Sequence, residues 1–557
     1  MSTSAPAHRL RRRIIPVVAL AAAGSIGGVV ALSGCGSSAS AGSAPASIAG
    51  YIPARSPLYI QISTDTSGAQ WANLTRLATL FPGFGEIQAE IETTLAGEGV
   101  DWDTDLKPLL GDAAAIALTE ITDMTSAPLA DGGGAVRAAP AEAAGLALVA
   151  VLQIAPGKAD DVEALLAAGP GGMEKTGTRD GAVMYGDVTA GVHAAVTEES
   201  LVAGPSIAAV TAALDAHAAG GDAALSGVVR FNEALALLPD DVFALAYVNL
   251  DEAGKAAKEM VPQVGTLADG QMGGAAAMSV TAEPDGLRIK AVLLDAPLAI
   301  DLKPFTPSLV AQAPADTVAF LGFSRLDDIV AAVVSGASTG GSDGTRTQIG
   351  AITGQLPALL GVSEAGLSNL AGGEQAVVVT DARPTPGVAL ALTVVDGPQA
   401  ATSLTALATS VPALARQVGV GTLAIGTATP FSESGVTGQV IPVGDSGWSV
   451  AWGVRGNLAA IGSGAGTVAD VLAPRSRAQS LAGTAGFTAA TQGMPDTVTA
   501  LAYVDMRKVM TLLAANGVFT GADGARVRAN LAPFTRIAAW STAGATPTVE
   551  VVVGIGR

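Results

Sequence analysis

ALAYV stands at residues 244–248 and again at residues 500–504, 256 positions later. The first copy lies in PDDVFALAYVNL (239–250) and the second in PDTVTALAYVDM (495–506). Proline cannot donate to a β-ladder and is expected just before the first paired residue, so each segment predicts a β-strand. A run this apolar would be an aggregation hazard on an open edge, and we therefore expect an interior strand in both places. The repetition indicates a duplicated fold.

Other segments recur in the same order. LLGDAAAIALTEI (109–121) is similar to LAGGEQAVVVTDA (370–382), and Phe231 and Pro239 precede Phe487 and Pro495 by the same 256 positions. The sequence thus predicts two tandem, pseudo-symmetric copies, residues 51–297 and 313–557, joined by a proline-punctuated linker at 298–312. Turn-rich insertions near 123–143 and 424–439 are expected to lie outside the common core as surface loops.

Each copy is predicted to mix strands and helices. Leu58–Ser63 reads as a strand, and Ser67 as the cap of a helix that carries Trp71, Leu74, Leu77 and Phe81. GLALVAVLQI (145–154) is apolar on both faces, which is typical of a central strand. The turn Pro284-Asp285-Gly286 predicts a hairpin with Met278, Val280, Leu287, Ile289 and Leu293 on its buried side and Ser279, Thr281, Arg288 and Lys290 on its wet side. The expected fold class is α+β, with helices packed on antiparallel sheets.

The first residues indicate export. Arg9, Arg11, Arg12 and Arg13 precede IIPVVALAAAGSIGGVVAL (14–32), which carries no charge. Leu32-Ser33-Gly34-Cys35 then resembles the bacterial lipobox, which implies cleavage between Gly34 and Cys35 and a lipid on the Cys35 thiol. Residues 1–34 are therefore expected to be a signal peptide. The alternative is an uncleaved signal anchor, since 19 apolar residues can span a bilayer.

Residues 35–50 are rich in Ser, Gly and Ala and are expected to form a flexible tether. Cleavage before Cys35 removes four arginines and no acid, so the formal charge of −19 becomes −23. This charge argues against nucleic acid and against adsorption to anionic headgroups. Cys35 is the only cysteine, so no internal disulfide can form. We expect the protein on the extracytoplasmic side of the cell membrane, held there by acyl chains such as palmitate.

Two segments resemble one protein family. YIPARSPLYIQISTDTSGAQWANLTRLATLFPGF (51–84) and DTDLKPLLGDAAAIAL (103–118) are similar to the opening of the uncharacterised exported domain-of-unknown-function family numbered 3352. The resemblance implies an exported, often membrane-attached protein. It implies no reaction, so it transfers no catalytic residue to this chain.

Four candidate chemistries can be weighed against plainer interpretations. Asp101, Asp103, Asp105 and Asp112 follow the spacing of a calcium loop, but Leu106 stands where that loop needs glycine, which favours a helix-capping acidic turn. Gly462, Gly464 and Gly466 could form a phosphate-binding turn or simply a tight strand-to-helix turn. His193 and His217 adjoin no nucleophile motif and are expected to be structural or solvated. A carboxylate-pair glycosidase stays open because many of the 49 acids could pair.

From these observations we expect a membrane-anchored lipoprotein of the cell envelope with a non-catalytic binding or structural role. Its expected partners are the membrane, through Cys35, and envelope proteins or an apolar ligand. No cofactor, metal or catalytic residue is predicted. The first alternative is a carrier of an apolar or lipid ligand, and the second is a carboxylate-dependent hydrolase.

Overall fold

The computed structural model describes residues 48–97, 99–121, 146–168, 172–187, 191–260, 273–295, 303–325, 361–381, 385–417, 425–444 and 447–557. The chain divides between Pro297 and Leu298 into two compact units, which we call unit 1 and unit 2.

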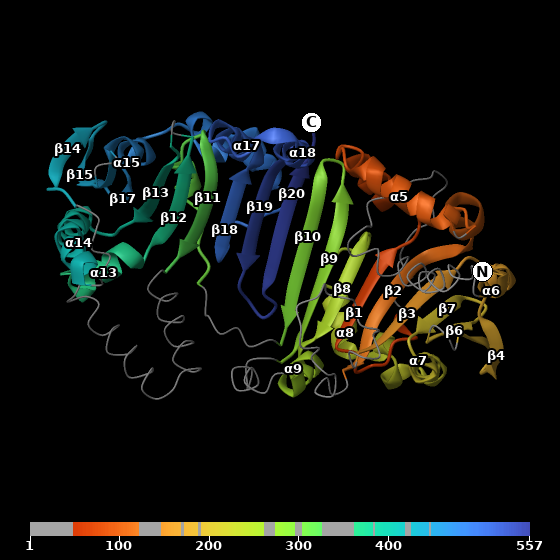
Figure 1. Cartoon of the computed structure of the whole chain (residues 1–557). Coiled ribbons are helices and arrows are strands. Elements are labelled where there is room, and N and C mark those ends of the chain that lie inside the picture. The colour runs from red at the N-terminus through yellow and green to blue at the C-terminus, as the bar shows by residue number, and fades with distance from the viewer. Residues whose placement is uncertain are drawn as a thin grey trace, which may run out of the picture. The chain divides into compact units, whose positions relative to one another are not determined.

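Unit 1 is built on an antiparallel sheet. Its described strands pair in the order β4-β5-β6-β7-β3-β2-β1-β8-β9-β10, and β10, β9, β8, β1, β2 and β3 lie side by side in Figure 1. The strands are β1 (Leu58–Ser63), β2 (Leu110–Ile121), β3 (Leu146–Ile154), β4 (Glu174–Arg179), β5 (Ala182–Asp187), β6 (Val192–Val196), β7 (Ser200–Gly204), β8 (Ala244–Asn249), β9 (Ala275–Glu283) and β10 (Gly286–Leu294).

Helices pack on this sheet and at its edges. They are α4 (Ala69–Ala78), α5 (Phe84–Gly97), α6 (Ala159–Ala168), α7 (Ile207–Ala219), α8 (Val229–Leu235) and α9 (Leu250–Met260). Helix α7 packs against β3, β6 and β7, and α8 against β9 and β10. Helix α4 packs against β9, and α9 against β8 and β9.

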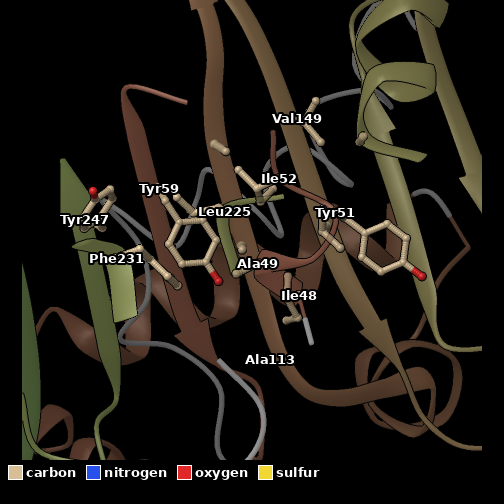
Figure 2. Close-up of a cluster of buried hydrophobic side chains, with 14 of the residues drawn as sticks. Ile48, Ala49, Tyr51, Ile52, Tyr59, Ala113, Val149, Leu225, Phe231 and Tyr247 are labelled. Atoms are coloured by element: carbon tan, nitrogen blue, oxygen red, sulfur yellow. The ribbon is translucent and has the colours of Figure 1, made fainter. Parts of the chain in front are cut away.

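The core of unit 1 lies between the sheet and helices α7 and α8. Phe231 of α8 is fully buried and meets Tyr59 and Tyr247 edge to face, with ring centroids 5.7 and 5.1 Å away. Ile48 and Ala49 are also buried in this core, as Figure 2 shows. Ile48 and Ala49, which the sequence pattern assigns to the tether, are therefore part of the folded core of unit 1.

The described strands of unit 2 also pair antiparallel. Its described strands pair in the order β14-β15-β16-β17-β13-β12-β11-β18-β19-β20. The strands are β11 (Thr317–Ser324), β12 (Glu374–Thr380), β13 (Gly387–Thr393), β14 (Thr429–Glu433), β15 (Val436–Val443), β16 (Trp448–Arg455), β17 (Leu458–Ser463), β18 (Ala500–Asp505), β19 (Phe534–Thr542) and β20 (Thr548–Ile555). Within each unit the strands thus follow the same order, and both units are α+β, as the sequence predicts.

The helices of unit 2 are α13 (Glu364–Ala371), α14 (Gly397–Gln417), α15 (Ala465–Leu472), α16 (Ala485–Ala490), α17 (Met506–Ala515) and α18 (Gly521–Leu531). Helix α15 packs against β13, β16 and β17, α16 against β19 and β20, and α17 against β11, β18 and β19. Phe487 of α16 meets Tyr503 with ring centroids 5.3 Å apart. Leu309 and Val310 are buried in the same core, so the second half of the expected linker, 298–312, belongs to unit 2.

ALAYV is an interior strand in both units, as the repeated segment predicts. Strand β8 lies between β1 and β9, and β18 lies between β11 and β19. Leu245 and Tyr247 are buried in the first, and Leu501 and Tyr503 in the second. In each unit the tyrosine of this strand packs in the core against a phenylalanine from the preceding helix, Phe231 of α8 or Phe487 of α16.

Two sequence predictions are wrong in detail. The insertion expected near 424–439 is not a loop outside the sheet: its residues 429–439 form β14 and the first half of β15 around a turn at Ser434 and Gly435, both with positive φ. Val436 is fully buried there, which anchors the hairpin. Ser67 does not cap α4, since Gly68 is the cap residue and the Ser67 hydroxyl donates to Asp65. The other expected insertion, 123–143, lies outside the described residues.

Candidate functional site

The sheet of unit 1 has two faces that differ in what packs on them. Residues directly opposite each other in an antiparallel pair share a face. Tyr59, Tyr247, Ala277 and Val292 therefore point to one side, where they join the buried core with α7 and α8. The intervening residues of β1, β2, β8, β9 and β10 form the other side.

We call this other side the apolar face of unit 1. It consists of Leu58, Ile60, Ile62, Ile116, Leu118, Ala244, Ala246, Val248, Ala276, Met278, Val280, Leu287, Ile289, Ala291 and Leu293. All of these side chains are aliphatic or thioether, and each is at least partly exposed. None belongs to a buried cluster formed by the described residues. Met278 is 40% exposed.

Unit 2 has the same feature. Its apolar face consists of Ala319, Leu321, Phe323, Val377, Val379, Val388, Ala500, Ala502, Val504, Ile537, Ala539, Val549, Val551 and Val553. Leu321, Val388 and Val549 are 46%, 44% and 44% exposed. Gln375 and Ser541 lie on the same side but are hydrogen-bonded. The Gln375 amide donates to the carbonyl oxygens of Ala371 and Gly373, and the Ser541 hydroxyl pairs with that of Thr499. Soluble proteins rarely expose large contiguous apolar patches without a use for them, so both faces are candidate binding surfaces.

The sequence pattern assigns the buried and exposed sides of the β9–β10 hairpin the wrong way round. Met278, expected on the buried side, is exposed, whereas Ser279, expected on the wet side, is 1% exposed. The faces are therefore reversed, because α8 packs on the side that carries Ser279, Val292 and Leu294. The available signal was that Ala275, Ala277, Val292 and Leu294, at the far end of the hairpin from its turn, make the supposedly wet side apolar as well.

The acidic segment 101–112 forms a capped turn. The Asp101 carboxylate accepts from the Thr104 amide at 2.9 Å, and these hydrogen bonds hold the pKa of Asp101 below its usual value. Asp105 in turn accepts from the Asp101 amide at 2.8 Å, and Asp103 faces Lys107 at 3.8 Å. These carboxylates bind neighbouring backbone amides and a lysine and do not converge on one point. This favours the capping turn over the calcium loop.

Part of this segment lines a polar cleft of about 450 Å³ at the end of β1 and the start of β2. Asp65, Asp103, Lys107 and Asp112 are the charged residues around it. Among the described residues, no three His, Cys, Asp or Glu side chains converge as metal ligands would.

The glycine turn and the histidines have structural explanations. Gly464 precedes α15 with φ of +89°, and a Cβ on Gly462 would lie 2.7 Å from the Val388 carbonyl oxygen. His217 lies in the last turn of α7, where its ring stacks on Tyr51 with ring centroids 3.9 Å apart. His193 lies on β6 opposite Gly186 and Gly204.

Glu374 is a buried acid that holds two backbone segments together. Its carboxylate accepts from the amides of Ser308 and Leu309 at 2.9–3.0 Å. Burial raises its pKa, and these hydrogen bonds oppose the rise only in part. Glu374 thereby fixes the buried segment around Leu309 to the first residue of β12.

Cys35 and Gly34, the expected lipidation and cleavage residues, lie outside the described residues. In the part of the chain that the structure describes, every helix is too short or too polar to cross a bilayer.

The fold and surfaces define the class: an α+β protein of two antiparallel-sheet units, each with an apolar face. The chain belongs to the family described as "Protein of unknown function (DUF3352)", whose model matches residues 14–537. No curated protein matches the sequence.

Among solved structures, crystal forms III and IV of TP0453 are similar at 9% and 10% identity, with TM-scores of 0.24 and 0.25. Each match covers 45% of this chain. It covers 80% of the chain in crystal form III and 83% of the chain in crystal form IV. Scores this low carry no argument about this chain.

Proposed function

We propose that this protein is a lipid-anchored, extracytoplasmic envelope protein that binds an apolar ligand without catalysis. The observation that supports the proposal is the apolar face of each unit. Binding sites for apolar ligands are lined mainly by hydrophobic side chains, with few polar groups. Of the alternatives that the sequence left open, a carrier therefore fits better than a purely structural role. A carboxylate-dependent hydrolase would need converging acids, whereas Asp101, Asp103, Asp105 and Glu374 each make local contacts.

The anchor is part of the same proposal. The basic cluster before residue 14, the apolar stretch 14–32 and the motif Leu32–Cys35 support export, cleavage and acylation of Cys35. Because Ile48 is packed in unit 1, the tether between Cys35 and Ile48 has 12 residues. A flexible tether of this length spans roughly 20 Å. Unit 1 would thus remain close to the membrane that supplies an apolar ligand.

We further propose that the two units are tandem, pseudo-symmetric copies of one ancestral domain. The common strand order supports this, as do the Phe231–Tyr247 and Phe487–Tyr503 pairs. The buried pairs Ile48–Ala49 and Leu309–Val310 stand 261 positions apart, at the same place before the first strand. Each copy would then bring its own binding surface.

The proposal is tested by extracting the native protein. The full chain, purified from membranes and exchanged out of detergent, is extracted with organic solvent and the extract is analysed by mass spectrometry. We expect non-covalent lipid in near-stoichiometric amounts, well above a mock purification. An extract that matches the mock purification would refute the binding function and leave only the anchor.

A further inference from the structure

Unit 2 carries a basic helix pair near its end. The pair consists of α17, α18 and the turn between them, residues 506–531. Its basic residues are Arg507, Lys508, Arg526 and Arg528, and its single acid is Asp523. These residues give the segment a formal charge of +3 in a chain whose net charge is −19. Helix α9, which follows β8 as α17 follows β18, has more acids than bases. The positive charge is therefore a feature of this helix pair and not of the fold common to both units.

Helix α18 has little support from the rest of unit 2. Among the described helices and strands, none packs extensively on it, and none of its own side chains is buried. It has 11 residues, and isolated helices shorter than about 12–15 residues are marginal in water. Gly521 and Gly524 weaken it further, because glycine is a poor helix former. A helix of this length and composition needs a partner surface to hold it.

The exposed surface around α18 combines positive charge with apolar groups. Val527 is 51% exposed and stands between Arg526 and Arg528, which are both exposed. Within the described part of the chain, neither guanidinium forms an ion pair. Val518, in the turn before the helix, is 55% exposed. A Cβ on Gly524 would lie 2.6 Å from a backbone carbon of this turn, so the turn packs tightly against the helix. The two valines and the two arginines thus belong to one compact surface.

This combination matches the chemistry of an anionic bilayer surface. Interfacial helices place their apolar side chains at the boundary between headgroups and acyl chains, and arginines reach out to the headgroup phosphates. Each Lys or Arg close to an anionic leaflet favours the bound state by about fivefold. An acidic protein or a nucleic acid would pair with the arginines but would leave Val518 and Val527 in water. Anionic phospholipid is therefore the partner that uses both parts of the surface.

We propose that α17 and α18 form a docking surface for anionic phospholipid headgroups, and that this surface orients unit 2 on the membrane. The inference rests on the membrane attachment in the proposed function and adds a second point of contact to it. Outside residues 506–531 the formal charge is −22, the difference between −19 and +3, so an anionic leaflet repels the rest of the chain. The net charge thus opposes adsorption in any other orientation, while the basic helix pair faces the headgroups.

The inference is tested by measuring how close α18 lies to the headgroups. Val527→Cys in the full chain is labelled with a thiol-reactive fluorophore and reconstituted, through its own N-terminal segment, into vesicles that contain a headgroup-linked quencher. The vesicles are phosphatidylcholine alone or an equal mixture with phosphatidylglycerol. Val395→Cys is the matched control, because Val395 is 96% exposed in unit 2 and lies outside α17 and α18. Labelled wild type gives the background from Cys35, and urea midpoints equal to wild type confirm that each variant is folded.

We expect strong quenching of the label at position 527 in the mixed vesicles and little in phosphatidylcholine, with little quenching at position 395 in either. High salt should remove the effect, because it screens exposed charges. Arg526→Ser combined with Arg528→Ser should lower the ratio of quenched to unquenched label about 25-fold, since two contributions of about fivefold are lost. Arg55→Ser combined with Arg477→Ser is the control for net charge, because both residues are exposed and lie outside the helix pair. It should leave the ratio unchanged.

Equal quenching at both labelled positions, or equal quenching in both kinds of vesicle, would overturn the docking surface. An acylated chain that shows no quenching at position 527 would overturn the surface and leave the anchor in place. Quenching at position 527 in a chain whose intact mass shows no acyl group on Cys35 would do the reverse. A fluorescence change that depends on protein concentration and not on phosphatidylglycerol would also overturn the proposal, and would assign α18 to a second copy of this chain.

Discussion

Phe231→Ala is expected to destabilise unit 1 by about 3–5 kcal/mol, the range for losing a buried Phe side chain. Phe231 is fully buried and its ring meets both Tyr59 and Tyr247 edge to face. The substitution removes both ring contacts and leaves a cavity between α8 and the sheet. Hydrogen exchange followed by mass spectrometry on the full chain measures the effect, as lost protection of β1 and β8.

Phe487→Ala should act in the same way on β11 and β18 of unit 2. Val229→Ala is the matched control on α8, because that side chain is 69% exposed and should change stability by less than about 0.5 kcal/mol. Equal, small effects of Phe231→Ala and Val229→Ala would show that the aromatic cluster does not hold unit 1 together.

Cys35→Ala is expected to abolish acylation completely. The thiol is the only sulfhydryl in the chain, so no other cysteine can take up the lipid. Metabolic labelling with an alkyne palmitate should mark the wild type and leave the variant at background. The variant should also keep residues 1–34, because the expected cleavage depends on the modified cysteine, and intact mass would report this.

Ser37→Ala is the control for this substitution, since Ser37 lies two residues past the cysteine and outside the motif. It should be labelled and processed as wild type is. Persistent label on Cys35→Ala, or wild-type chains that retain residues 1–34, would contradict the lipid anchor and favour an uncleaved signal segment.

The strands of the core could be predicted because their pattern is strong. ALAYV combines a buried Tyr with buried Leu at alternate positions, and an apolar run of this kind needs neighbours on both edges. Leu58–Ser63 and the β9–β10 hairpin were also predicted at their observed positions. These elements depend on local periodicity and on turn residues, both of which are visible in one sequence.

Other features depend on tertiary contacts that leave little local trace. Ile48 and Leu309 lie in short Ala- and Pro-containing stretches that resemble linkers, yet both are buried against a sheet. The β14–β15 hairpin was mistaken for a loop because Ser, Gly and Thr dominate its sequence, although Val436 and the positive φ of Gly435 fix it in the sheet.

Of these features, the apolar faces were the hardest to predict from the sequence. Pattern shows that Met278 and Val292 are both apolar and face opposite ways, but not which side the helices cover. That choice is made by α7 and α8, whose positions follow from chain connections rather than from the strand itself. The apolar face could be recognised only once the register placed Ala246 beside Ile60 and Met278.

The most direct test of apolar binding is photolabelling of the wild-type chain with a photoreactive palmitate analogue, followed by peptide mapping. Our account predicts label on peptides from β1, β8 and β9 and from β11, β18 and β19, and loss of that label with excess palmitate. Label confined to peptides such as those around Val229 or Val395, or label that excess palmitate does not displace, would contradict it.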